Sequence, residues 1–356
     1  MYLKSLFLQN FRNYKKSEFS FSPDVTLVVG PNTSGKTNLL ESIYLLAHGG
    51  SFRTNHEQEM IGWGEEIGRV KGEQAGSPAD VTDLEIILTS GFVQNQKVPL
   101  KKYLVNGVVK RRVDFIGNQL CVLFSPVDLE IIVDSPSRRR DFLDFLLEQV
   151  DKEYRFAIMV YTKALRQRNA LLQEAQRIGF RNEKQFEYWD NLLIKNGEII
   201  TQKRESFIEF LNKSQKEIFD FATVYDKSII SEARLLQYKE AEIGAGVTLV
   251  GPHRDDINFQ MFNNTRRITH DIKLFGSRGQ QRLTLLQLKL LEVSFIEKKT
   301  DQRPILLLDD IFSELDKKHI NLVLERLGEQ QTIITTTHKE FIGNSKLKGM
   351  DVIELG

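Results

Sequence analysis

The segment from Gly30 to Thr37 constrains the fold more than any other part of the sequence. It reads Gly-Pro-Asn-Thr-Ser-Gly-Lys-Thr and matches the pattern G-x-x-x-x-G-K-[ST]. The apolar run Val25–Val29 precedes it, and apolar residues at helical spacing follow it. A glycine loop between a strand and a helix is typical of phosphate binding, because its backbone N–H groups surround a phosphate while the lysine neutralises β/γ charge and the hydroxyl binds Mg²⁺. An ordinary glycine turn that caps a helix is the alternative.

We therefore predict a nucleotide-binding site with ATP and Mg²⁺ as cofactors. Lys36 is the predicted catalytic cation and Thr37 a magnesium ligand. The predicted nucleotide-binding residues of the loop are Gly30, Pro31, Asn32, Thr33, Ser34, Gly35, Lys36 and Thr37.

A second motif is the apolar run Ile305–Leu308, which ends in Asp309 and Asp310. Buried parallel strands have this composition, and ligands bind at their carboxyl ends. We predict that Asp309 holds Mg²⁺, directly or through water, and that Asp310 is catalytic and polarises the attacking water. An aspartate pair that only caps the next helix is the alternative.

Two further segments carry candidate phosphate contacts. Ser277 and Gly279 begin a periodic helix, where N–H groups and the helix dipole favour an anion, although Ser277 could serve only as an N-cap. His338 follows the strand-like run 333–337, and we predict that it is catalytic through a contact with the γ-phosphate. A surface histidine is the alternative. Between these segments, Ser313–Asp316 follows the two aspartates at the distance of a turn.

The order of the patterns indicates an α/β domain that is split in sequence by a helical insertion. Proline is absent from residue 137 to about 216, and apolar residues recur there at helical spacing with a break near Gly179. We predict an N-terminal part of the α/β domain at 1–135, a helical lobe at 136–244 and a C-terminal part of the same domain at 245–356. The strands are predicted at 3–9, 19–21, 25–29, 84–89, 102–105, 108–109, 304–308 and 332–336, and a helix at 280–297.

Composition excludes several classes of protein. The chain has 356 residues, 41% of them hydrophobic and 27% charged, which disfavours disorder and a simple coiled coil. The net charge is only +1, so a nucleic acid would have to bind local basic clusters. Such clusters occur at 101–102, 110–112 and 138–140, and each could equally be a solvated face.

Cysteine content and the N-terminus predict a cytoplasmic protein without a membrane segment. With Cys121 alone, no internal disulfide is possible and no oxidising compartment is required. The start Met1–Lys4 does not lead into an apolar signal core, and no run approaches the roughly 20 apolar residues of a membrane span.

Taken together, these motifs resemble the ABC-type ATPase heads that SMC proteins share with the RecF family of DNA-repair proteins. Five strings resemble the RecF family in particular: Asn-Phe-Arg-Asn-Tyr at 10–14, Gly-Lys-Thr-Asn-Leu-Leu-Glu at 35–41, Ser-Phe-Arg at 51–53, Gly-Pro-His-Arg-Asp-Asp at 251–256, and Leu-Asp-Asp-Ile-Phe-Ser-Glu-Leu-Asp at 308–316. The resemblance implies an α/β fold with an ABC-type P-loop head and a mixed sheet, split by a mostly helical second lobe, and without an SMC arm.

The resemblance also implies a mechanism. Two heads would form an ATP-dependent homodimer, with Lys36, Thr37 and Asp309 acting in cis and with Ser277, Gly279 and Gln280 contacting the other subunit's nucleotide. Arg53 resembles an arginine of SMC heads that senses nucleotide or DNA, and a plain surface arginine is the alternative. The implied partners are double-stranded or gapped DNA, RecO and RecR, with slow, DNA-stimulated ATP hydrolysis and assistance in loading RecA.

Some positions depart from the family's pattern. Val127 and Asp134 stand where the family has an acidic residue and a glycine, and Arg278 stands where transporter heads have glycine. Asp310 replaces a glutamate of many relatives, and its shorter side chain is consistent with slow hydrolysis. An ABC-type subunit that drives a membrane or other protein partner, and an interaction protein with a vestigial site, are the competing hypotheses.

Overall fold

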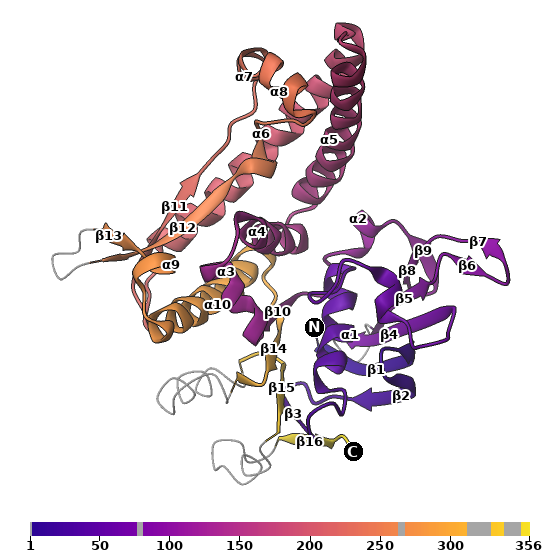
Figure 1. Ribbon diagram of the computed structural model, residues 1–356. Helices are drawn as coiled ribbons and strands as arrows, with labels where there is room; N and C mark the ends of the chain where they lie inside the picture. The colour runs from indigo at the N-terminus through magenta and orange to yellow at the C-terminus, as the bar shows by residue number, and fades with distance from the viewer. Residues whose placement is uncertain (1, 77–80, 263–267, 312–328, 338–349) are drawn as a thin grey trace. The chain divides into compact units, whose positions relative to one another are not determined.

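The structure is a computed structural model that describes residues 2–76, 81–262, 268–311, 329–337 and 350–356 (Figure 1). The chain divides into two compact units. We call residues 1–128 and 292–356 the head unit, and residues 129–291 the helical unit.

A parallel sheet with the strand order β10-β14-β15-β3-β16 forms the centre of the head unit. Its strands are β10 (Cys121–Phe124), β14 (Ile305–Asp309), β15 (Thr332–Thr336), β3 (Val25–Val29) and β16 (Asp351–Glu354). Every residue of the first four strands is buried, as expected for a parallel sheet covered on both faces. Because the strands are parallel, the loops after β3 and β14 lie at the same edge.

A six-stranded antiparallel sheet in the order β2-β1-β4-β5-β8-β9 completes the head unit. Its inner face joins the apolar core around helix α1 (Lys36–His48), and its outer face carries cross-strand ion pairs such as Lys71–Asp83. The strands are β1 (Tyr2–Phe11), β2 (Tyr14–Ser20), β4 (Ile67–Ala75), β5 (Val81–Thr89), β8 (Lys101–Val105) and β9 (Val108–Lys110). The predicted hairpin turn at Asn106-Gly107 is confirmed by positive φ at both residues.

Short elements connect the strands of the head unit: the 3₁₀ helix η1 (Glu57–Met60), the strands β6 (Phe92–Val93) and β7 (Gln96–Lys97), and the helix α2 (Arg112–Phe115). After β10, the 3₁₀ helix η2 (Pro126–Leu129) and the helix α3 (Glu130–Val133) lead into the helical unit.

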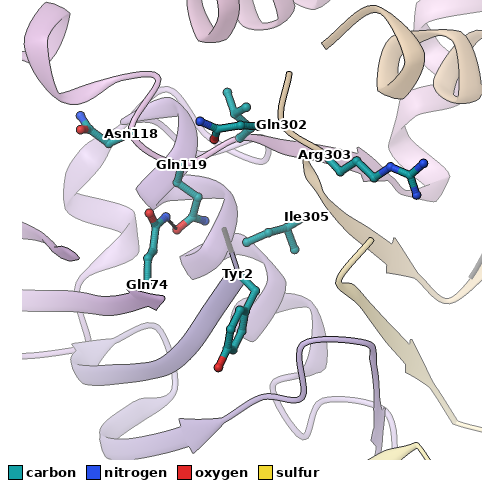
Figure 2. A pocket seen from close by; sticks show the side chains of 8 residues that line it. Tyr2, Gln74, Asn118, Gln119, Gln302, Arg303 and Ile305 are labelled. Carbon is teal, nitrogen blue, oxygen red and sulfur yellow. Dashed lines mark hydrogen bonds between the residues drawn. The ribbon is translucent and has the colours of Figure 1, made fainter. Parts of the chain in front are cut away.

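Two buried glutamines tie helix α1 to the antiparallel sheet. Figure 2 shows Gln74, from β4, facing Gln119, which precedes β10. Gln74 Nε2 donates to Gln119 Oε1 at 2.8 Å, and Gln119 Nε2 donates to the Ile43 carbonyl at 3.0 Å. Because buried amides destabilise the fold unless they are hydrogen-bonded, this chain of bonds fixes α1 against β4.

The helical unit is built on three consecutive helices, α4 (Pro136–Val150), α5 (Lys152–Ile178) and α6 (Glu183–Lys213). Figure 1 shows α5 and α6 as a long antiparallel pair, and the predicted break at Gly179 is the left-handed C-cap of α5, with φ 72°. The unit also holds the antiparallel strands β11 (Phe221–Asp226), β12 (Asp256–Phe262) and β13 (Ile268–Asp271). Its other helices are α7 (Glu232–Gln237), α8 (Lys239–Ala245), η3 (Pro252–Arg254), α9 (Ile272–Phe275) and the start of α10 (Arg278–Thr300).

The unit boundaries differ from the division at 135/136 and 244/245 that the sequence predicts. The first boundary lies at 128/129, and the second lies at 291/292. The larger difference has a physical reason: β12 pairs with β11 along its length, and residues 245–291 belong to the helical unit. Pairing between distant segments leaves no mark in local periodicity, which is why the sequence assigned residues 245–291 to the head.

A buried charge network surrounds the Gly251–Asp256 turn. Arg204, only 1% exposed, donates to Asp255 at 2.9 Å, to Asp144 at 2.7 Å and to the Pro252 carbonyl at 2.8 Å. The network extends to Arg139, whose guanidinium is bidentate on Asp256. Fully buried ions persist only with such partners.

The three arginines at 138–140 are largely occupied within the helical unit. Arg139 is buried on Asp256, Arg140 donates to the Asp255 carbonyl, and Arg138 pairs with Glu130. Arg139 is therefore not part of a solvated face and serves the fold of the helical unit, whereas Arg138 remains exposed.

His253 is expected to make the stability of the helical unit depend on pH. Its Nε2 lies 3.0 Å from the Thr248 carbonyl, which can only accept, so in the neutral ring Nδ1 accepts from the Tyr161 hydroxyl at 2.8 Å. Burial lowers the pKa of His253 from 6.5 to about 4. Because the unfolded chain then binds more protons than the folded chain in this interval, stability falls as the pH falls through it.

We expect wild type to lose up to about 3 kcal/mol more stability than a His253→Gln variant between pH 6.5 and pH 4. Urea unfolding of both proteins across this range measures the difference. Parallel pH profiles would show that His253 does not supply it.

Candidate nucleotide site

The glycine loop after β3 is held in shape by the β1–β2 turn. The Tyr14 hydroxyl donates to the Gly35 carbonyl at 3.1 Å, and Asn13 Nδ2 donates to the Ser34 carbonyl at 3.4 Å. Gly35 has φ 105°, and a Cβ there would lie 2.7 Å from the Asn13 amide. The loop therefore requires glycine at position 35 for both its conformation and its space.

Lys36 begins helix α1 and turns its ammonium back into the loop. Its Nζ donates to the carbonyls of Gly30 and Pro31, each at 2.8 Å. Burial lowers the pKa of Lys36 below its ordinary value, and the carboxylates of Asp310 and Asp309 oppose this shift. The ammonium is thus held over the centre of the loop, where a phosphate would lie.

Thr37 and Asp309 meet across the carboxyl edge of the parallel sheet. Thr37 Oγ1 donates to the two Asp309 carboxylate oxygens at 3.0 and 3.2 Å, and Thr335 Oγ1 donates to Asp309 Oδ1 at 2.7 Å. Burial raises the pKa of Asp309, while hydrogen bonds from Thr335 and Thr37 lower it. A hydroxyl beside a carboxylate is the hard oxygen donor set that suits Mg²⁺.

Asp310 follows directly and adopts a left-handed conformation with φ 48°. Its backbone N–H points to Thr335, whose carbonyl and hydroxyl oxygens lie 3.2 and 3.1 Å away. Such a conformation is unfavourable for a residue other than glycine and is common at functional sites. It directs the Asp310 side chain to the cavity that Asp309 also lines.

These residues surround a cavity of about 480 Å³, which is the size of a small-molecule site. Its lining residues are Asn32, Thr33, Gly35, Lys36, Thr37, Asn38, Arg53, Pro126, Asp309, Asp310 and Thr337. The fold thus brings together the glycine loop, the Asp309-Asp310 pair and Arg53.

The other predicted site residues lie elsewhere or cannot be placed. Ser277 directly precedes α10 in the helical unit, and Gln280 lies in the first turn of that helix. The two residues cap the helix reciprocally: Ser277 N donates to Gln280 Oε1, and Gln280 N donates to Ser277 Oγ. Gly279 lies between them. His338 and the Ser313–Asp316 segment lie outside the residues that the structure describes.

Some residues at the site were not assigned a role from the sequence. Asn13 and Tyr14 buttress the loop, Thr335 holds Asp309, and Asn38 lines the cavity. Asn13 and Tyr14 belong to one of the strings shared with relatives, which was the available signal. Thr335 had none, because it reaches Asp309 only through the pairing of β14 with β15.

Comparison with known proteins identifies the family. The family model described as "RecF/RecN/SMC N terminal domain" matches residues 2–353. The "DNA replication and repair protein RecF" of Bacillus cereus (strain G9842) is 35% identical over 378 residues, which cover the whole chain and 97% of the relative. The chain belongs to the RecF family. The same identity and coverage hold for the RecF protein of Bacillus thuringiensis (strain Al Hakam).

Solved structures agree with this membership. The RecF structure described as "Structure of the recombination mediator protein RecF-ATPrS in RecFOR pathway" matches with a TM-score of 0.86 and 32% identity, covering all of this chain and 96% of the other. A RecF-ATP structure of the same pathway matches with a TM-score of 0.85 and 33% identity, covering 95% of this chain and 92% of the other. An SMC head domain from Pyrococcus furiosus matches with a TM-score of 0.51 and 18% identity, covering 99% of this chain and 93% of the other. This match shows a shared fold alone.

The predicted ABC-type head is confirmed by these RecF and SMC matches. The predicted membership of the RecF family is confirmed as well. In the described part of this RecF-family chain, the helices are too short or too polar to cross a membrane.

Proposed function

We propose that this protein is an ATP-dependent DNA-binding protein of recombinational repair. Two copies bind double-stranded or gapped DNA with ATP between their heads, and slow, DNA-stimulated hydrolysis releases them. One observation carries the proposal: Lys36, Thr37, Asp309 and Arg53 converge on a single cavity at the carboxyl edge of a parallel sheet. The RecF structure with ATP, a relative at 33% identity, supports ATP as the ligand.

Four side chains that line the cavity, together with His338, have catalytic or metal-binding roles in this proposal. Lys36 exchanges the neutral carbonyls of Gly30 and Pro31 for phosphate oxygens. The phosphate oxygens carry a negative charge, so their hydrogen bonds with the ammonium are stronger. Thr37 and Asp309 would hold Mg²⁺, which supplies positive charge to the phosphates. Asp310 orients the attacking water, and His338 contacts the γ-phosphate.

Ser277, Gly279 and Gln280 are proposed to contact the ATP of the other subunit. Among the described residues, the atom nearest to a Cβ built on Gly279 is Ser277 Oγ, at 3.9 Å, and Gly279 has no positive φ. The subunit's own packing therefore does not require glycine here. Close approach of a second molecule would require it, and the N-terminus of α10 favours an anion.

The DNA contacts are proposed to come from the head unit's basic clusters. Lys101 is occupied by Glu57 and the Gly49 carbonyl, and Arg112 donates to the His48 carbonyl. Lys102 and Lys110 are exposed and can reach phosphates. RecO and RecR as partners, and assistance to RecA loading, are carried over from the recombination-mediator role in the RecFOR pathway that a relative's description gives.

Dimerisation tests the proposal. In sedimentation velocity with gapped duplex DNA, wild type is expected to be monomeric without nucleotide and dimeric with ATP and Mg²⁺. Ser277→Arg is expected to weaken the dimer at least tenfold, because the long cation fills the space for the partner's nucleotide, while ATP binding to the monomer is unchanged.

Ser231→Arg is the matched control, because Ser231 caps α7 in the same unit and is not a proposed contact. A wild-type protein that remains monomeric with saturating ATP and DNA would contradict the proposal.

A further inference from the structure

A buried carboxylate lies one turn beyond the glycine loop. Glu41 is on helix α1, four residues after Thr37, and its side chain is fully buried. A carboxylate is rarely buried completely unless cations and hydrogen-bond donors surround it. The partners of Glu41 therefore indicate what it does.

Arg12 is the main partner. Its Nε and Nη2 donate to the two Glu41 oxygens at 2.8 and 2.5 Å, and its Nη1 donates to the Glu59 carbonyl at 2.6 Å. Arg12 belongs to the β1–β2 turn and has φ 51°. This bidentate pair joins the turn that buttresses the glycine loop to the helix that follows the loop.

A second set of bonds links Glu41 to the segment after α1. The Ser51 hydroxyl donates to Glu41 Oε1 at 2.5 Å and accepts from the backbone N–H groups of Arg53 and Thr54, at 2.9 and 3.2 Å. The carboxylate thereby fixes the backbone from which the Arg53 side chain leaves.

Arg53 lies between Glu41 and the cavity. Its Nη1 donates to Asn38 Oδ1 at 2.7 Å and is 3.5 Å from Glu41 Oε2. The side chain is 41% exposed and lines the nucleotide cavity. Among the described residues, Nε and Nη2 of Arg53 make no hydrogen bond, so these donors are available to a ligand.

The charges indicate a purpose for this arrangement. Glu41 carries one negative charge and faces the guanidinium groups of Arg12 and Arg53, so the three side chains together have a net positive charge. Because Arg53 lines the cavity, this positive charge lies at the cavity wall. Holding a long arginine in one geometry before the ligand arrives reduces the conformational entropy lost on binding.

We propose that Glu41 is a positioning residue for nucleotide binding, which acts by holding the Arg53 guanidinium at the cavity for a phosphate of the nucleotide. This inference rests on the proposed function, because it requires that ATP bind in this cavity. A purely structural role, in which Glu41 only anchors the β1–β2 turn through Arg12, predicts different behaviour.

A double-mutant cycle separates the two roles. The dissociation constant of a fluorescent ATP analogue with Mg²⁺ is measured for wild type, Glu41→Gln, Arg53→Ala and the double variant, together with thermal unfolding of each. We expect about a tenfold weaker affinity for each single variant, and no further loss in the double variant, because both changes remove the same contact.

Two further variants keep the test decisive. Glu41→Asp retains the charge for Arg12 but withdraws the carboxylate by one methylene, so it is expected to fold and to weaken binding only when Arg53 is present. Glu85→Gln is the matched control: Glu85 pairs with Arg69 in the same unit, away from the cavity, and its loss should leave the affinity unchanged.

Two results would overturn the inference while leaving ATP binding established. In one, the Glu41 variants lose the same affinity for the analogue whether or not Arg53 is present. In the other, folded Glu41→Asp and Glu41→Gln keep the wild-type affinity. A wild-type protein that fails to bind the analogue would instead reject the proposed function, and the inference with it.

Discussion

Replacement of Lys36 by alanine is expected to raise the dissociation constant for ATP about 100-fold. In the folded protein, the Lys36 ammonium is held over the glycine loop by two carbonyls, each 2.8 Å away. Phosphate oxygens are stronger partners than neutral carbonyls, since charge-assisted hydrogen bonds contribute about 1.5–3 kcal/mol each. Loss of the ammonium removes that difference and leaves phosphate charge uncompensated in a partly buried site.

Isothermal titration of ATP with Mg²⁺ measures this effect. Lys71→Ala is the control, because Lys71 pairs with Asp83 on the outer face of the antiparallel sheet. Wild-type affinity in Lys36→Ala would show instead that the lysine only closes the loop on itself, and the proposed site would be wrong.

Replacement of Asp255 by alanine is expected to lower the free energy of unfolding of the helical unit by about 3–5 kcal/mol. Asp255 is fully buried and accepts from Arg204, from the Tyr225 hydroxyl and from the Ser228 N–H. Its removal leaves the buried Arg204 with one carboxylate, Asp144, and leaves two other donors unpaired.

Urea unfolding monitored by circular dichroism measures the loss. Lys213→Ala is the control: Lys213 pairs with Glu209 on the surface of α6, and its replacement should change stability by less than about 0.5 kcal/mol. A similarly small effect for Asp255→Ala would mean that the helical unit does not depend on this network.

Local patterns predicted those parts of the fold that depend on neighbours in sequence. The strand Val25–Val29, helix α1, the Asn106-Gly107 turn and the helical break at Gly179 all occur as predicted. Each depends on alternation, helical periodicity or the backbone freedom of glycine, which a short window contains.

Elements that depend on distant partners were missed or misassigned. Strand β16 is mostly exposed and lies at the sheet edge beside β3, and the sheet of β11, β12 and β13 places residues after 244 in the helical unit. β12 does alternate, with Ile257 and Phe259 buried, but alternation does not tell which strand is its partner, and that pairing with β11 decides the unit to which it belongs.

The nucleotide site divides in the same way. The sequence by itself determined the chemistry, because the spacing of Gly30, Gly35, Lys36 and Thr37, and the strand before Asp309, specify which groups are present. The tertiary structure alone decided which groups meet: the parallel pairing of β14, β15 and β3 brings Asp309 to Thr37 and Thr335.

The tertiary structure also decided that Glu41 holds Arg53 beside the cavity. From the sequence alone, a carboxylate on a helix is expected to be exposed to solvent. Only burial against Arg12, 29 positions away, makes it part of the site, because a buried charge requires its partners to be in place.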